Sequence, residues 1–116
     1  MAIESNIYSP QMEIEDIDRT INIIDEDLLA GAAAVRDAEG KVEHNQQVMD
    51  ELLQLQKQIT LDDFEKEILE RQKKLRELYL KKAAMIRLAF EADEFECNRR
   101  KRELLKRKEV LEKQIN

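Results

Sequence analysis

The sequence predicts an all-α protein, a long antiparallel helical hairpin of coiled-coil type that assembles into an oligomeric helical bundle. Its 116 residues include two Gly and one Pro, too few turn formers for many short elements, and 40% are charged. Apolar residues recur at alternating short spacings, the heptad pattern of helices that pack side by side. Charge is segregated: residues 1–58 carry a net −9 (13 acidic, 4 basic) and residues 59–116 a net +3 (13 acidic, 16 basic).

The N-terminal segment divides into an arm and a helix start. Residues 1–8 show no apolar period, and we expect them to form a flexible N-terminal arm. Ser9 can cap a helix, Pro10 suits the first helical position, and Glu13 complements the positive end of the helix dipole. The first long helix, acidic in character, is therefore predicted over residues 9–59.

One heptad frame follows this helix from Ile14 to Ile59, and eleven of its fourteen seam positions are apolar. Gly31 and two polar residues are the exceptions. Asn45 and Gln56 are the polar ones, and we expect them to fix the packing register rather than to bind a ligand. The seam consists of Ile14, Ile17, Ile21, Ile24, Leu28, Gly31, Val35, Ala38, Val42, Asn45, Met49, Leu52, Gln56 and Ile59.

The stretch QITLDDF predicts a tight turn between two helices. Thr60 can cap the second helix, with Asp63 in the position of a capping-box Glu, and Ile59 and Phe64 are placed to form a hydrophobic staple. No Gly or Pro enforces a break here, so a single uninterrupted helix is the alternative.

The second long helix is predicted over residues 60–116, with a basic C-terminal part. Between Leu78 and Phe95 the apolar surface is wider than one stripe, so more than one side must be covered. The expected core stripe consists of Phe64, Ile68, Leu75, Tyr79, Ala83, Ile86, Phe90, Cys97, Leu104, Leu111 and Ile115. The residues expected to form an oligomer or partner interface are Leu78, Leu80, Met85, Leu88 and Phe95.

A turn at Thr60 would place residue i opposite residue 120 − i. Basic residues 99–108 would then face the acidic residues among 12–21, and the small residues 30–34 would face the bulky ones among 86–90. Charge and volume therefore support the same pairing, and both are independent of the capping signals that predict the turn.

The run NRRKRELLKRKE contains seven basic residues in ten positions, and these are candidate phosphate-binding residues. Three interpretations remain open for them: pairing with the acidic first helix together with solvation, nucleic-acid binding, and contact with an acidic protein partner. The acidic whole chain and the lack of interleaved aromatic residues favour the first. The seven are Arg99, Arg100, Lys101, Arg102, Lys106, Arg107 and Lys108.

The remaining residue types give no sign of catalysis or cofactor binding. Cys97 is the single cysteine and His44 the single histidine, and no phosphate loop, nucleophile elbow or zinc spacing occurs. The chain shows neither a signal peptide nor an apolar stretch long enough to span a membrane. We expect a cytoplasmic protein with no catalytic residue, cofactor, metal, membrane or small-molecule substrate.

These observations favour a non-enzymatic interaction or assembly protein of scaffold, adaptor or chaperone type. It is expected to act through an oligomeric helical surface, as a homo-oligomer that also docks a protein partner. The alternative is a nucleic-acid-binding accessory protein that uses the basic run 99–108. Helical hairpins serve many unrelated functions, so fold alone does not choose between the two.

Overall fold

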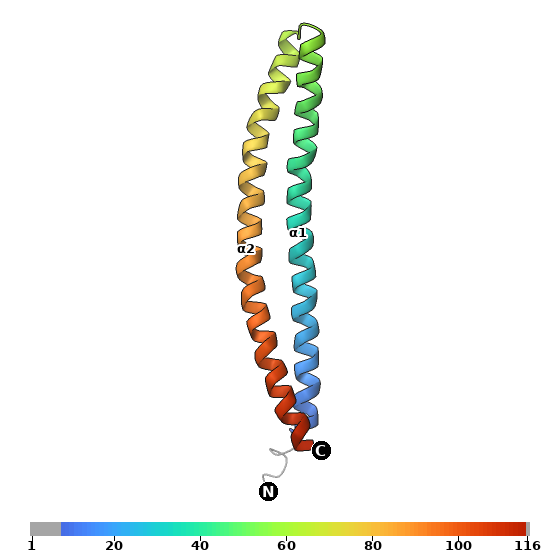
Figure 1. Cartoon of the computed structure of the whole chain (residues 1–116), viewed down its shortest axis with the longest axis vertical. Coiled ribbons are helices and arrows are strands. Elements are labelled where there is room, and N and C mark those ends of the chain that lie inside the picture. The colour runs from blue at the N-terminus through green and yellow to red at the C-terminus, as the bar shows by residue number, and fades with distance from the viewer. Residues whose placement is uncertain (1–7, 116) are drawn as a thin grey trace. The chain divides into compact units, whose positions relative to one another are not determined.

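The computed structural model describes residues 8–115, which form two helices (Figure 1). Helix α1 spans Pro10–Gln58 and α2 spans Asp63–Ile115, with 49 and 53 residues respectively. Among these residues there is no strand, so the all-α prediction is confirmed. The chain leaves helical conformation between α1 and α2, and the alternative of one uninterrupted helix is wrong.

The chain divides into two compact units. We call residues 32–90 the turn unit; it is a helical hairpin that contains the connection between α1 and α2. We call residues 8–31 with 91–115 the terminal unit; it pairs the start of α1 with the end of α2. Contacts in both units are antiparallel, and the paired residue numbers sum to between 117 and 126. These sums agree with the expected 120 to within about two helical turns.

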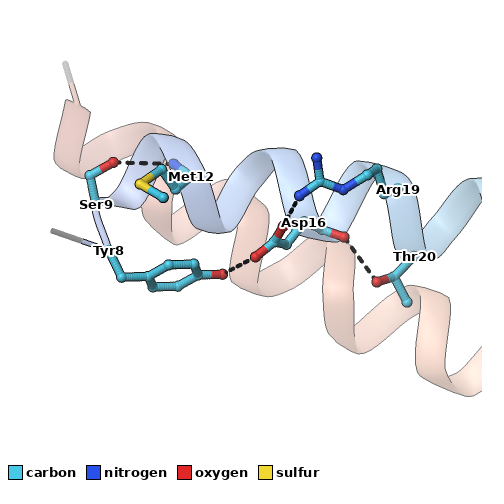
Figure 2. A network of polar contacts seen from close by, with 6 residues as sticks. All are labelled: Tyr8, Ser9, Met12, Asp16, Arg19 and Thr20. Carbon is cyan, nitrogen blue, oxygen red and sulfur yellow. Dashed lines mark hydrogen bonds and ion pairs between the residues drawn. The ribbon is translucent and has the colours of Figure 1, made fainter. Parts of the chain in front are cut away.

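Helix α1 begins as its sequence predicts. Ser9 Oγ accepts a hydrogen bond from the Met12 N–H at 3.2 Å, which identifies Ser9 as the N-cap (Figure 2). Asp16 ties the first turns together: Tyr8 Oη donates to its carboxylate at 2.5 Å, and Arg19 pairs with the same group. Of the predicted arm, only Tyr8 falls among the described residues, and there its hydroxyl is hydrogen-bonded.

The turn differs from the prediction in its cap. Asp62, not Thr60, is the N-cap of α2, because the Glu65 N–H donates to Asp62 Oδ1 at 2.8 Å. The reciprocal bond of a capping box runs from the Asp62 N–H to Glu65 Oε1 at 3.2 Å. Leu61 then precedes the cap and is buried with 3% exposure, whereas Phe64 is 69% exposed. The predicted Ile59–Phe64 staple is therefore wrong, and Phe64 is not a core residue.

The terminal unit has a small apolar core. Ile14 and Ile17 of α1 pack against Leu111 of α2, with Ile21 and Leu104 at the edge. All five belong to the predicted seams. Ile115, which was expected in the same stripe, is exposed at the end of α2. The pairing rule of 120 places Ile115 beyond Pro10, the first residue of α1, so no helix lies opposite to cover it.

The turn unit buries a second set of apolar side chains that extends to the turn. Gln56 and Ile59, the last two predicted seam positions, are exposed, and Leu61 and Leu69 are buried without having been predicted. On α2 the change follows from the cap, because α2 starts two residues later than predicted and presents other residues to α1. The buried apolar residues of the unit are Val35, Ala38, Met49, Leu61, Leu69 and Ala83.

Candidate functional site

Four of the seven basic residues in 99–108 are engaged within the terminal unit. Three of them bond to acidic residues of α1: Lys101 to Asp25 at 2.5 Å, Lys108 to Asp18 at 2.7 Å, and Arg107 to both Glu13 oxygens at 3.0 and 3.2 Å. The fourth pairs within α2, as described below. The predicted match between basic run and acidic helix is thus present in this unit.

Arg99 pairs within its own helix, donating to Glu96 and Glu103, each at 2.8 Å. The other three side chains, Arg100, Arg102 and Lys106, are exposed and make no ion pair or hydrogen bond among residues 8–115. Seven charges on one helix cannot all reach the acidic face of a single neighbour. The outward cationic surface is therefore smaller than the sequence indicates.

The interhelical ion pairs shift the pKa values of their members. The hydrogen bond that Arg107 donates to Glu13 lowers the pKa of Glu13. The same hydrogen bond raises the pKa of Arg107. The hydrogen bond to Asp18 raises the pKa of Lys108. In each case the charged form is the favoured one, so these groups are poised for charge pairing and not for proton transfer.

The predicted interface residues on α2 are all exposed. Leu78, Met85, Leu88 and Phe95 are 61%, 70%, 66% and 65% exposed, and Leu80 is less so. The first three and Leu80 belong to the turn unit, and Phe95 belongs to the terminal unit. Large apolar side chains left this open are candidates for contact with another molecule.

A cavity of about 140 Å³ lies in the turn unit, beside Ala34 and Ala38. These small side chains leave space between the helices that Tyr79 does not fill. Asp37 and Lys41, which also line the cavity, are paired with each other at 3.7 Å. The lining thus combines apolar side chains with Asp37, Lys41, Tyr79 and Lys82, and it contains no histidine, cysteine or serine.

The single cysteine and histidine form no reactive centre. Cys97 is half-buried, and burial together with the nearby Asp93 and Asp27 raises the pKa of its thiol, which disfavours the reactive thiolate. His44 is exposed on α1. Among residues 8–115 no three His, Cys, Asp or Glu side chains are grouped to hold a metal ion. Over the same range, neither helix has an apolar stretch that could cross a membrane.

Sequence reasoning missed the partner of Asn45. This residue is 2% exposed in the turn unit, and its Nδ2 donates to Gln72 Oε1 at 2.6 Å and to the Gln72 carbonyl oxygen at 3.3 Å. The heptad frame predicts Asn45 as a register residue, but Gln72 lies outside the apolar stripe predicted for the second helix. The predicted pairing rule could have found it, since it places residue 45 opposite residue 75, one turn away.

No protein-family model, curated protein or solved structure matches this chain.

Proposed function

We propose that this protein is a non-enzymatic interaction or assembly protein that acts by self-association and by docking a protein partner through the outer surface of α2. The observation that carries the proposal is the exposure of Leu78, Met85 and Leu88, each more than half open to solvent. Isolated exposed apolar residues are ordinary, but three large ones within eleven positions of one helix favour a contact surface.

The charge arrangement supports the same proposal. Lys101, Arg107 and Lys108 are already paired with α1, so the basic run contributes to packing within the terminal unit. Ion pairs this exposed add little to stability, and their main effect is on register. An enzyme would need convergent acid, base or nucleophilic groups in a pocket, and in the described cavity Asp37 and Lys41 form an exposed ion pair with each other.

Light scattering across a wide concentration range tests the proposal. We expect a molar mass above that of the 13.7 kDa chain, rising with concentration until one assembly dominates. A fully folded chain that stays monomeric at the highest concentration reached would contradict self-association.

A second candidate function, nucleic-acid binding, is favoured by Arg100, Arg102 and Lys106 of the basic run, which have no ion pair or hydrogen bond among residues 8–115. Phosphate binding releases counterions, so its affinity falls steeply and log-linearly with salt, whereas apolar docking responds weakly. A salt titration with labelled single- and double-stranded oligonucleotides separates the two, run beside an Arg100/Arg102/Lys106→Glu triple variant. We expect weak or no binding; tight binding that the variant loses while its assembly persists would favour the second candidate.

A further inference from the structure

The turn unit carries a basic stretch on α2 that its own acidic residues match only in part. Residues 71–90 hold seven basic side chains and one acidic one, Glu77, a net charge of +6 in a chain whose net charge is −6. Three of the seven pair with acidic residues of the same unit: Arg71 with Glu67, Lys73 with Glu70, and Arg87 with Glu39. The other four are exposed and make no ion pair or hydrogen bond among residues 8–115; they are Lys74, Arg76, Lys81 and Lys82.

Three of these lysines share one side of α2 with the exposed apolar residues of the turn unit. At about 100° per residue, the six side chains lie within an arc of about 120°, roughly half a turn around the helix from the buried Ala83. Glu77, the acidic exception, lies at the edge of this arc. We call the set the basic face; it consists of Lys74, Leu78, Lys81, Lys82, Met85 and Leu88.

The terminal unit carries the opposite charge on α1. Residues 8–31 hold seven acidic side chains and one basic one, a net charge of −6. Three of the acidic side chains pair with α2, and Asp16 pairs with Arg19 (Figure 2). The remaining three are exposed and make no ion pair or hydrogen bond within residues 8–115; they are Glu15, Glu26 and Asp27.

Two of these carboxylates lie beside exposed apolar side chains of α1. Ile23 and Leu29 are 58% and 69% exposed. At about 100° per residue, Glu26 and Glu15 both lie between them around the helix, about half a turn from the buried Ile17. We call Glu15, Ile23, Glu26 and Leu29 the acidic face.

We propose that the acidic face of one copy docks on the basic face of a second copy of this chain. Each face lies within one compact unit and combines large apolar side chains with charges of one sign. Docking then covers apolar surface on both copies and brings carboxylates to lysines. The proposal rests on the self-association proposed above and identifies the two surfaces that make it.

Charge favours the contact between unlike faces. Two basic faces would bring their lysines together, and two acidic faces would bring their glutamates together, so both like pairings are repulsive. Because each chain carries both faces, the unlike contact can be made twice between two copies or repeat from copy to copy.

The basic run 99–108 is a weaker counterpart for the acidic face. It lies in residues 91–115, which hold eight basic and seven acidic side chains, a net charge of +1. Several of its basic residues are also paired already, with α1 or within α2. The stretch 71–90 therefore offers the larger excess of positive charge to a second copy.

Charge reversal of one face at a time tests the contact in the full chain. Lys74→Glu/Lys81→Glu makes both faces acidic, and Glu15→Lys/Glu26→Lys makes both faces basic. Each variant alone should self-associate at least about tenfold more weakly than the wild-type chain in sedimentation, because like charges then oppose. An equimolar mixture of the two variants should associate again, because every face in the mixture finds a face of opposite charge.

Two control variants make the same changes of charge beside the turn. Lys57→Glu/Lys66→Glu and Glu51→Lys/Asp63→Lys alter exposed residues that lie outside both faces. Each control should associate within about twofold of the wild-type chain, as isolated surface substitutions do. Circular dichroism checks that all four variants fold.

Three results would contradict the proposal in different ways. Face variants that associate as well as the wild-type chain, or a mixture that associates no better than its components, would overturn this contact while self-association stands. An equal loss in the control variants would overturn it too, because overall charge and not the two faces would then govern association. A wild-type chain that stays monomeric would overturn both the contact and the self-association.

Discussion

At the residue scale, Asn45 is the most unusual side chain in the turn unit. It is buried and donates to Gln72, yet its Oδ1 has no hydrogen-bond partner among the described residues. A buried acceptor left unpaired costs about 1–3 kcal/mol. Such a residue is tolerated where it selects one packing register over others.

Replacing this side chain should therefore stabilise the fold. We expect Asn45→Leu to raise the free energy of unfolding by about 1 kcal/mol, because the unpaired oxygen is removed and apolar surface is buried instead. Urea denaturation measures the change. Asn45→Asp is the control, because it places a carboxylate in the same buried position and should destabilise the fold. If Asn45→Leu instead lowers the free energy of unfolding, the hydrogen bond to Gln72 contributes more than the unpaired oxygen costs.

Glu13 makes the stability of the terminal unit depend on pH in the acid range. Arg107 lowers its pKa in the folded state, so the folded chain binds fewer protons and stability rises with pH. The contribution is present above the ordinary pKa of 4.5 and is lost as pH falls through the lowered value. Glu13→Gln should therefore reduce stability at about pH 7 and lose its effect in strong acid at about pH 2.

Urea unfolding at the two pH values measures this difference, with the exposed Glu15→Gln as the matched control. We expect the control to lack the pH-dependent loss. The same deficit for Glu13→Gln at both pH values would indicate that the carboxamide disturbs packing and that the charge is irrelevant.

At the scale of the element, the start of α2 depends on one capping box. Asp62→Ala should lower the free energy of unfolding by about 1 kcal/mol, because the Glu65 N–H loses its acceptor. Thr60→Ala should change it by only a few tenths of a kcal/mol, since Thr60 lies outside the box. Urea denaturation of the two variants compares the two possible caps directly. A larger loss of stability in Thr60→Ala than in Asp62→Ala would identify Thr60 as the cap.

At the scale of the whole molecule, stability and assembly should be linked. If two copies bind only when folded, raising protein concentration shifts the equilibrium towards the folded dimer. A tenfold higher concentration should therefore raise the urea midpoint of the wild-type chain. The urea midpoint of Leu88→Glu should not change with concentration. A wild-type midpoint that is independent of concentration would show that folding is not linked to assembly.

Much of the fold could be predicted because its signals are local or periodic. Ser9 caps α1 as its position before Pro10 indicates, since a cap needs only its own first turn. The pairs Glu13–Arg107 and Asp18–Lys108 follow from charge segregation once the chain reverses. The exposed residues of α2 could be anticipated as well, because one neighbouring helix covers only one side of another.

The sequence by itself determined two helices, their antiparallel pairing and the acidic partners of the basic run, since heptad spacing and charge extend over many residues. Only the tertiary structure decided between Thr60 and Asp62 as cap, because both can accept a backbone hydrogen bond. Capping at Asp62 lets Leu61 bury its side chain, and Phe64 is turned to solvent. The pairing of Asn45 with Gln72 was decided in the same way, because it depends on the exact stagger of two helices that meet across 27 residues of sequence.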